Sequence, residues 1–365
     1  MKVLTVGGAM IDTVAVIDSA RIERMSMRNA DSSFLLLEEG RKTEAEDIST
    51  HVGGGGINAA VALARLGLDT AAVAKLGRDA RAETILNRLM DEGVSTRYVV
   101  RDSRAPTGAS VIISAHERNA AVFTFRGANT LLEPPDLRDD AFAVDLVFIS
   151  NLSNKSADCF PSIVRCAKSH GAQVATNPGI RQLSARGGPF MECLPLIDIL
   201  SINRAEAEVL VPSLIARFGE GGPPLPLAPD EEAPELEMRG LVGGGFQMSL
   251  SAFLNAVRGL GVANVLLTDG GGGAFLKTPE RIIHCPALRL PNVASTAGAG
   301  DAFSATFAAY VGLGRPPEEA LRAATLNAAS VVGHVDTQTG LLKREALDHR
   351  LAAEAERLPV QQWTA

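Results

Sequence analysis

The sequence has 365 residues, of which 46% are hydrophobic and 21% charged, and its formal net charge is −7. This composition is that of a folded globular protein and excludes a disordered or fibrous chain. Only 4% of the residues are aromatic. An acidic chain with few aromatic side chains is poorly suited to a phosphate backbone or to stacked bases, so we expect no nucleic-acid partner. The length fits one large α/β domain with an appendage, or two ordinary domains.

The cysteines and the apolar segments bear on where the protein works. Four cysteines, Cys159, Cys166, Cys193 and Cys285, are scattered without a Cys-x-x-Cys pair, which favours a reducing compartment over a disulfide scaffold. The opening MKVLTVG lacks the apolar core and the cleavage site of a signal peptide. The apolar run at residues 302–314 is shorter than the roughly 20 residues of a membrane helix. We therefore expect a cytoplasmic protein without a membrane partner.

Short β-branched runs alternate with helical patterns along most of the chain. Strands are predicted at residues 3–6, 71–74, 146–149, 173–176, 197–201, 265–268 and 274–277. Helices are predicted at residues 57–66, 80–92, 157–170 and 205–217, and after Asp301 and Pro317. Such alternation is typical of βαβ units. The sequence therefore predicts an α/β fold with a doubly wound, mostly parallel sheet.

Two stretches lie outside this alternation and predict a second, smaller sheet. Residues 109–125, ASVIISAHERNAAVFTF, alternate as two strands around a polar turn at residues 116–119. Residues 13–50 likewise lack a partner helix. Because both stretches leave the core near the edge of its sheet, we expect them to pair into a β-sheet lid. The predicted division is a core of residues 1–12, 51–108 and 126–365 and a lid of residues 13–50 and 109–125.

Residues 219–245 interrupt the alternation again and begin with GEGGPPLPLAPDEEAPELE. This stretch is too rich in Gly, Pro and acidic residues for a protein core. We expect it to form a long surface loop.

The strongest functional signal is STAGAGD at residues 295–301, which runs directly into the helical pattern AFSATFAAYVGLG. Small residues let backbone N–H groups converge, and the helix adds the positive end of its dipole, so the turn is suited to a phosphate or a developing anion. An acidic residue such as Asp301 is also an ordinary choice at a helix start. Beside an anion-binding turn, however, its carboxylate is placed to take a proton from a hydroxyl that attacks phosphorus.

A second glycine-rich segment, GGGGINAAVALARLG at residues 53–67, carries Asn58 in the first turn of a predicted helix. Glycine lets a ligand approach the backbone, although a tight strand-to-helix turn explains such a run equally well. The Gly-Lys-Ser/Thr end of a Walker loop is absent from the sequence. The early pair Gly7-Gly8 also lacks the later glycine of a dinucleotide-binding turn.

Two further segments are candidates for contacts with phosphates or a metal. Asn203 and Glu206, in NRAE after the predicted strand IDILSI, share a helix face and are suited to orient Mg²⁺ through its waters. The same spacing is that of a helix capping box. Thr268 and Gly270 begin the turn TDGGGG between two predicted strands, which by itself is an ordinary hairpin turn.

In this order the four segments resemble the ribokinase-like (PfkB) family of sugar and nucleoside kinases. The two family signatures are similar to GGGGINAAVALARLG near the N-terminus and STAGAGDAFSATFAA near the C-terminus, with NRAE and TDGGGG between them. GRDA, RAPTGASVI and FRGAN also resemble family segments, so the likeness covers most of residues 1–345. The resemblance implies a ribokinase-like fold and an ATP-dependent sugar kinase.

The resemblance also implies a role for each matching residue near the reacting groups. Asp301 would be the catalytic base. The hole for the γ-phosphate would be formed by Gly298, Ala299 and Gly300. The sugar hydroxyls would be bound by Asp12, Gly54 and Asn58. The lid would close over the sugar and exclude water.

On the nucleotide side, the resemblance implies that Asn203 and Glu206 hold Mg²⁺ through water and that Thr268 and Gly270 border the ATP phosphates. Asn327 would flank the adenine. The partners that we expect are a small-molecule sugar, ATP and, through the lid, a second copy of the chain.

The sequence departs from the family pattern at Ser295, where the family usually has an Asp that helps to bind an activating monovalent cation, and this puts potassium dependence in doubt. The lid hinge reads Pro106-Thr107-Gly108, without the basic residues by which some members hold phosphorylated sugars. This favours a neutral sugar, with Arg104 and Arg126 as the remaining candidates for a phosphate contact.

Two other functions remain open. A nucleoside kinase of the same fold would need aromatic stacking, for which the lid offers Phe34, Phe123 and Phe125. We expect these three to form the lid core instead, because they alternate within predicted strands. The second alternative is a relative that binds a sugar or a nucleotide without turnover, but such a protein would be free to lose Asp301, which is present here.

Overall fold

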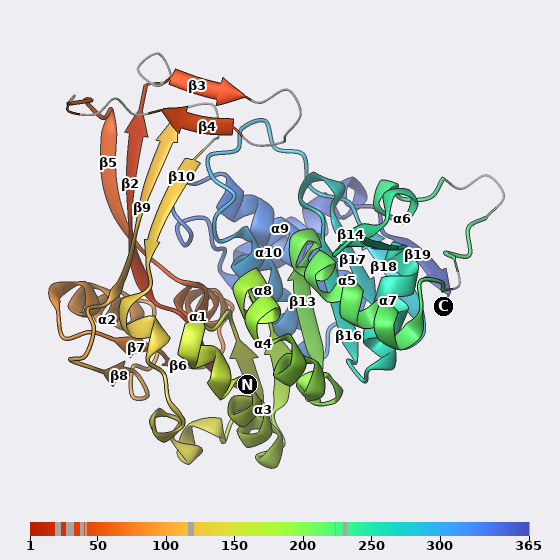
Figure 1. The fold of residues 1–365 in the computed structure, drawn as a ribbon, viewed down its shortest axis with the longest axis horizontal. Coiled ribbons are helices and arrows are strands. Elements are labelled where there is room, and N and C mark those ends of the chain that lie inside the picture. The colour runs from red at the N-terminus through yellow and green to blue at the C-terminus, as the bar shows by residue number, and fades with distance from the viewer. Residues whose placement is uncertain are drawn as a thin grey trace.

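The computed structural model describes residues 1–18, 23–26, 33–36, 40, 42–115, 120–222, 224–228 and 232–364. Nine strands within these ranges form one sheet: β1 (Lys2–Val6), β6 (Asp69–Val73), β11 (Leu146–Ile149), β12 (Gln173–Thr176), β13 (Ile199–Asn203), β16 (Asn264–Thr268), β17 (Ala274–Lys277), β18 (Arg281–Cys285) and β19 (Gln361–Thr364). Their order is β19-β18-β17-β16-β13-β12-β11-β1-β6 (Figure 1). The strands from β16 to β6 are parallel, and β17, β18 and β19 add antiparallel at one edge. The predicted mostly parallel sheet is confirmed.

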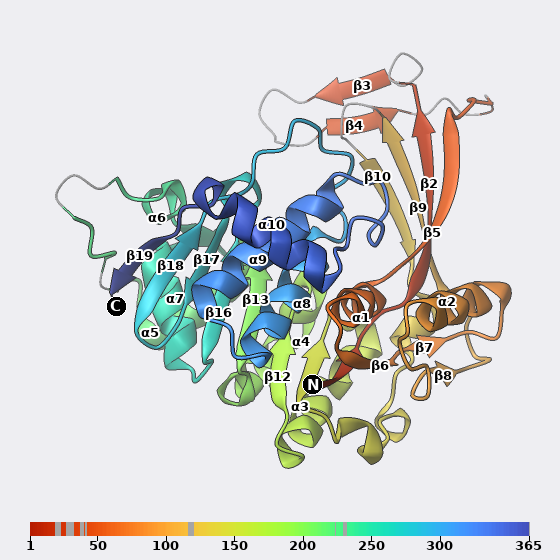
Figure 2. The same cartoon turned by 180° about the vertical axis from the view of Figure 1, so that it is seen from behind.

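Helices cover both faces of the central sheet, as a comparison of Figures 1 and 2 shows. One face carries α3 (Phe160–Ser169), α4 (Ile180–Cys193), α5 (Arg204–Phe218) and α7 (Leu250–Gly259). The other carries α1 (Gly55–Arg65), α8 (Ala299–Gly312) and α9 (Pro317–Val332). The same core includes side chains of α2 (Ala80–Asp91), which contacts β2 and β5, and of α10 (Arg344–Glu354), which packs against α9. Adjacent residues of β1 serve opposite cores, since Leu4 packs with the first group and Val3 with the second. Strands buried on both faces are continuously apolar, which is why runs such as LVFI are recognisable in the sequence.

A second sheet stands at one end of the core (Figure 1) and contains, within the described ranges, the four strands β2 (Met10–Ile17), β5 (Asp47–Gly53), β9 (Gly108–Ala115) and β10 (Ala120–Phe125). We call these four strands the small sheet. Its order is β10-β9-β2-β5, with β2 and β9 parallel and the other pairs antiparallel. The predicted small β-sheet is confirmed. Its strand β2 begins at Met10, so Asp12 lies on this sheet and not in the core segment where we expected it.

The small hairpin of β3 (Glu23–Ser26) and β4 (Ser33–Leu36) lies across the top of the small sheet in Figure 1. The predicted turn at residues 116–119 and the side chain of Phe34 lie outside the described part of the chain. Two short strands, β7 (Lys75–Leu76) and β8 (Val100–Arg101), pair beside β6.

The base of the small sheet is tied to the core by Asp79 and Thr107. Asp79 caps α2 by accepting the Ala82 N–H at 3.0 Å. It also accepts the Thr107 N–H and the Thr107 hydroxyl, each at 2.7 Å. Thr107 is fully buried and directly precedes β9. The segments GRDA and PTG therefore meet where the chain leaves the core for the small sheet.

The expectation of a surface loop over residues 219–245 is wrong for its second half. This part forms α6 (Glu235–Arg239) and β14 (Leu241–Gly243), which pairs with β15 (Phe246–Met248). Leu236 and Leu241 are buried and belong to the core that contains α5 and α7. The sequence analysis missed these two elements because it judged the stretch by its overall content of Gly, Pro and acidic residues. Such an average does not reveal that single leucines within the stretch are buried.

The part of the chain that the structure describes contains no helix that combines the length and the hydrophobicity needed to span a membrane. All four cysteines lie in the described ranges and are free thiols.

Candidate active site

Most of the predicted residues gather at the carboxyl ends of the parallel strands, beside the base of the small sheet. The Gly56 N–H donates to the Gly8 carbonyl at 3.1 Å and so brings the start of α1 to the end of β1. The Ser304 hydroxyl on α8 hydrogen-bonds the Ser201 hydroxyl on β13 at 2.7 Å. These contacts place the N-termini of α1 and α8 side by side. In open α/β sheets, ligands bind at this end of the strands.

Asp301 lies in the first turn of α8 and faces α1. Its Oδ2 accepts a hydrogen bond from Asn58 Nδ2 at 2.8 Å. A Cβ on Gly55 would lie 3.0 Å from Asp301 Oδ1 and 2.0 Å from Ser150 Oγ, so the glycine run gives Asp301 its room. Burial raises the pKa of the Asp301 carboxyl, the Asn58 hydrogen bond lowers it, and the charge of Asp12 raises it. A carboxylate with a raised pKa is a better proton acceptor than an exposed one.

Asp12 on β2 points to the same place from the small sheet. It pairs across the strands with His51 and Ser110 and accepts a hydrogen bond from the Ser110 hydroxyl. Burial raises the pKa of its carboxyl, although the Ser110 hydrogen bond and the positive charge of His51 lower it. Gly54 caps α1 with φ 98°, a conformation that favours glycine, and its carbonyl accepts the first hydrogen bonds of that helix. The structure thus brings Asp12, Gly54 and Asn58 together with Asp301.

The turn before Asp301 directs backbone N–H groups out of the start of α8. Gly298 is the N-cap residue, with a left-handed φ of 78°, and Ala299 begins the helix. Nothing lies within 4 Å of the position that a Cβ on Gly300 would take. The first N–H groups of a helix have no partner within it, so this turn is a candidate anion site. The Ala299 N–H also donates a long hydrogen bond of 3.4 Å to the Thr296 carbonyl.

A cavity of about 450 Å³ opens next to this turn. Its polar lining includes five of the predicted residues, Asn203, Thr268, Gly270, Ala299 and Gly300. The rest of its wall, which the sequence analysis missed, is mostly apolar and includes Ala287, Leu288, Leu290, Val293, Phe303, Ala328 and Val332. A mostly apolar cavity with a few polar groups in its wall is suited to a ligand that has a flat base and a charged tail.

The expectation that Asn327 flanks the adenine is not met. Asn327 is fully buried, its Nδ2 donates to Thr306 Oγ1 at 2.8 Å, and its Oδ1 accepts the Leu342 N–H at 2.9 Å. Its neighbours Thr325 and Ala328 line the cavity instead. The reason is helix periodicity. Positions 325, 328, 329 and 332 lie on the face of α9 that lines the cavity, and position 327 lies on a different face.

Asn203 and Glu206 form the capping box that the sequence analysis kept as an alternative. The Glu206 N–H donates to Asn203 Oδ1, and the Asn203 N–H donates to Glu206 Oε2, each at 2.9 Å. Glu206 is 7% exposed. Burial raises the pKa of its carboxyl from 4.5 to about 7, with a further increase from the charge of Asp301. No positively charged side chain of the described residues offsets this shift.

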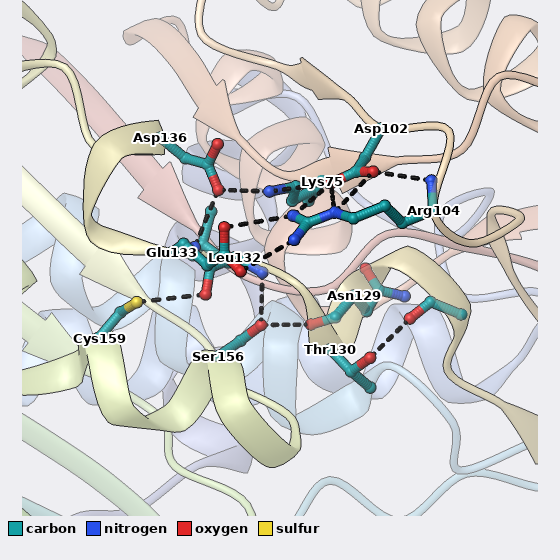
Figure 3. Close-up of polar contacts among 11 residues, drawn as sticks. Lys75, Asp102, Arg104, Asn129, Thr130, Leu132, Glu133, Asp136, Ser156 and Cys159 are labelled. Atoms are coloured by element: carbon teal, nitrogen blue, oxygen red, sulfur yellow. Dashed lines mark hydrogen bonds and ion pairs between the residues drawn. The ribbon is translucent and has the colours of Figure 1, made fainter.

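Arg104, a candidate for a substrate phosphate, is engaged elsewhere. Figure 3 shows its guanidinium between Asp102 and Glu133, with N···O distances of 2.6 and 3.1 Å. The buried Lys75 completes this cluster through Asp102 and Asp136. Hydrogen bonds from Arg104 hold the pKa of Asp102 well below its usual range. The cluster braces the segment that leads to the small sheet.

Arg126, the other candidate, donates to Ser153 Oγ at 2.7 Å. Burial lowers the pKa of its guanidinium, and the neighbouring charge of Arg181 adds to the effect. Phe123 and Phe125, expected in the lid core, are 59% and 52% exposed. Phe123, Val111 and Thr13 are paired across neighbouring strands, so their side chains lie on one face of the small sheet. Because successive residues of a strand point to opposite faces, Asp12 lies on the other face.

The chain is similar to known proteins over most of its length. The model of the pfkB family carbohydrate kinases matches residues 12–344. The chain is 28% identical to the deoxyribokinase of Salmonella typhi over 346 residues, which cover 93% of this chain and 98% of the relative. It is 25% identical to the ribokinase of Staphylococcus aureus over 304 residues, which cover 82% of this chain and 86% of the relative.

Solved structures share the fold. The ribokinase of Thermotoga maritima superposes with a TM-score of 0.72 at 22% identity, covering 96% of this chain and 99% of the other. The ribokinase of Arabidopsis thaliana complexed with ribose and ATP gives 0.69 at 23% identity, with coverages of 96% and 98%. The nucleoside kinase of Methanocaldococcus jannaschii gives 0.70 at 17% identity, also with 96% and 98%. With a family match over nearly the whole chain, this protein belongs to the pfkB family of carbohydrate kinases, phosphotransferases that act on a sugar hydroxyl.

Proposed function

We propose that the protein transfers the γ-phosphate of ATP to a hydroxyl of a neutral sugar, with Asp301 as general base. The observation that carries this proposal is the position of Asp301, a carboxylate with a raised pKa in the first turn of α8, directly after the glycine-containing turn at the N-terminus of that helix. A base and an anion-binding turn side by side are what phosphoryl transfer to a hydroxyl requires.

In the proposed step the Asp301 carboxylate accepts the proton of the sugar hydroxyl while that oxygen attacks the γ-phosphorus. The bond from the γ-phosphorus to the β–γ bridging oxygen breaks, and ADP leaves with that electron pair. The N–H groups of Gly298, Ala299 and Gly300 stabilise the negative charge that develops on the transferred group. Asp12, Gly54 and Asn58 hold the other sugar hydroxyls, and the small sheet acts as a lid that excludes water.

The nucleotide fits the cavity of about 450 Å³ beside α8. Thr268, Gly270 and Asn203 line it and would border the phosphates. The apolar wall of Ala287, Leu288 and Ala328 would receive the adenine in place of Asn327.

Mg²⁺ would be held through water by Glu206 and Asn203. The donor set fits, because both offer oxygen atoms and the buried Glu206 carboxylate lacks a compensating cation among the described residues. When bound, the metal neutralises charge on the ATP phosphates.

Glu206→Gln tests this assignment by stability and by metal dependence. Since folding raises the pKa of Glu206 from 4.5 to about 7, its contribution to the unfolding free energy is complete below pH 4.5 and is lost as the pH rises through 7. This loss is on the order of 3 kcal/mol. The variant keeps the helix cap, because a Gln oxygen still accepts the Asn203 N–H. Since Gln does not titrate, its melting temperature should depend less on pH between about 5 and 8, the range in which Glu206 titrates. The Mg²⁺ concentration for half-maximal rate should rise. An unchanged Mg²⁺ curve would reduce Glu206 to a helix cap.

The substrate that we propose is a neutral pentose. The two relatives compared above are a deoxyribokinase and a ribokinase, and Arg104 is occupied by acidic side chains. The alternative of a nucleoside kinase is disfavoured because Phe123 faces away from Asp12. The test is a coupled assay of ADP release with ribose, deoxyribose, hexoses, nucleosides and sugar phosphates. Turnover should be highest with a pentose; absence of turnover on the whole panel would favour a protein that binds without catalysis.

Potassium is expected to stimulate this enzyme weakly. The Ser295 hydroxyl accepts the Ala297 N–H at 3.1 Å, and the Ala294 N–H donates to the Val332 carbonyl at 2.9 Å, so protein groups already order the turn. Ser295 is neutral, which does not fit a cation site that depends on a negative ligand. Rates in potassium, sodium and tetramethylammonium at matched ionic strength should be similar, with potassium activation appearing in Ser295→Asp. Strong saturable activation of the unmodified enzyme would contradict this prediction.

We also propose that two copies associate through the small sheet. Ile48, Val111, Phe123 and Phe125 lie on the face opposite Asp12 and are 45–66% exposed. Burying such a face is favourable. Phe123→Asp should shift sedimentation from dimer to monomer, whereas Val122→Asp, an equally exposed change on the other face, should not. A monomer in the unmodified protein would reject the proposal.

A further inference from the structure

The orientation of the Asn58 side-chain amide decides whether Asp301 meets a donor or an acceptor. Asn58 is 3% exposed and has two hydrogen-bonded sides. Its Nδ2 donates to Asp301, while its Oδ1 accepts from Thr337 Oγ1 at 2.9 Å and from Gln338 Nε2 at 3.1 Å. Were the amide turned over, its oxygen would face the carboxylate, and both groups would be acceptors.

Gln338 has the same ambiguity, and Arg88 resolves it. The Nε of Arg88 donates to Gln338 Oε1 at 2.9 Å. Because a guanidinium has only donors, Gln338 must turn its oxygen to Arg88 and its N–H to Asn58. Gln338 is 2% exposed, so water does not compete for either end.

The guanidinium of Arg88 is itself held in place. The Nη2 of Arg88 lies 2.9 Å from Glu92 Oε1, and Arg65 pairs with the same carboxylate at 2.6 Å. The Nη1 of Arg65 also donates to the Gln338 carbonyl at 2.7 Å, which fixes the backbone of that residue. The hydrogen bonds therefore run in one direction, from Arg88 through Gln338 and Asn58 to Asp301. We call these four residues the relay.

We propose that Gln338 is a positioning residue of the kinase, which sets the amide of Asn58 so that its N–H group holds the catalytic carboxylate of Asp301. This rests on the proposed role of Asp301 as the base. Thr337 supports the same orientation from the next position in the loop, and it also packs against the anion-binding turn, since a Cβ on Gly298 would lie 2.6 Å from the Thr337 Cβ.

The charged groups around the relay belong to several elements. The charge of Asp12 on β2 raises the pKa of Asp301, and the charge of Asp301 raises the pKa of Glu206 on α5. Arg65, Arg88, Glu92 and Asp336 surround Gln338. Gln338→Glu adds a negative charge to these groups, and a nearby negative charge also raises the pKa of Asp301. A second variant that changes a donor to Asn58 without adding charge is therefore needed beside it.

Gln338→Glu is the main test, because Glu has nearly the same shape, still accepts from Arg88 and has no N–H to give Asn58. The Asn58 amide should then turn its N–H to the introduced carboxylate and its oxygen to Asp301. The expected result is a fall in kcat of about 10-fold or more, the scale of one lost hydrogen bond to a charged group. The acid limb of the pH profile should move to higher pH, because Asp301 loses the donor that lowers its pKa. The KM for ATP should stay the same, since Gln338 does not line the nucleotide cavity.

Two matched variants keep the test independent of folding. Thr337→Val removes one donor to Asn58 and should lower kcat several-fold with the acid limb moved in the same direction. Thr339→Val removes a hydroxyl from the same loop that serves Asp336, and it should leave both unchanged.

The outcomes separate the relay from the proposed function. Gln338→Glu and Thr337→Val could both leave kcat and the pH profile unchanged, as expected for Thr339→Val. If Asp301→Asn is inactive in that case, the positioning role of Gln338 is rejected and the role of Asp301 as base is kept. If Gln338→Glu does not fold, Thr337→Val decides in the same way. Activity in Asp301→Asn would reject the proposed function itself, whatever the loop variants show.

Discussion

Asp301→Asn is expected to lower kcat by about 10²–10⁴-fold, the usual cost of losing a general base. Asn keeps the shape of the side chain, and its oxygen still accepts the hydrogen bond from Asn58 Nδ2. The fold should therefore persist, and removing a buried charge should leave the melting temperature equal or higher at pH 8. The measurements are the rate of ADP release, the melting temperature and the affinity for ADP.

Asp158→Asn is the matched control for this prediction. Asp158 is an exposed carboxylate that pairs with Arg186 at 2.9 Å, and the same chemical change there should leave both rate and stability nearly unchanged. A kcat of Asp301→Asn close to that of the control would remove Asp301 from the role of base. Loss of ADP binding in Asp301→Asn would mean instead that the carboxylate shapes the nucleotide site.

Two glycines of the turn before Asp301 should respond to Ala in opposite ways. Gly298 has φ 78°, and a Cβ there would lie 2.6 Å from the Thr337 Cβ. Gly298→Ala should therefore lower the unfolding free energy by about 2 kcal/mol or more, together with activity. Gly300 is helical, and a Cβ there meets open space. Gly300→Ala should be as stable as the unmodified protein or more stable, because Ala favours a helix.

Activity should still fall in Gly300→Ala, by about 10-fold or more in kcat/KM, since the methyl group would occupy the space proposed for the phosphate. Thermal unfolding and steady-state kinetics of both variants distinguish the two effects. Full activity in Gly300→Ala would show that the phosphate does not approach this part of the turn. A stable Gly298→Ala would show that the loop around Thr337 yields to the added methyl group.

The sequence predicted the central sheet because its strands are buried on both faces and so appear as short, continuously apolar runs. It placed Asp301 and Asn58 correctly at helix starts, since glycine-rich turns before Ala-rich helices are recognisable without a structure. It failed at Asn327 because LRAATLNAAS has small residues all round the helix, so periodicity does not show which face meets the cavity. For Phe123, alternation indicated a strand but not which side of the small sheet stays exposed.

The contacts of Thr337 and Gln338 were beyond sequence reasoning for a different reason. They lie 279 and 280 positions from Asn58 along the chain, in a loop without any recognisable motif. The packing of α9 against α8 and of α8 against α1 brings that loop to α1, where Arg65 holds it by hydrogen bonds to the Gln338 and Leu341 carbonyls. Nothing in the sequence distinguishes Gln338, which is buried and hydrogen-bonded at both ends of its amide, from an exposed glutamine.

The strand order of the central sheet allows it to grow from β1 outward during synthesis. Once β6 has paired with β1, each later strand from β11 to β19 adds to the same edge in chain order. The sheet face beneath α8 and α9, which includes Phe148 and Leu266, stays uncovered until those late helices emerge. Their arrival covers this apolar surface and at the same moment delivers Asp301 to Asn58. The residue that we propose as the base thus reaches its partner only when the helices that cover this apolar surface, a surface of the kind that makes folding intermediates aggregate, are also in place.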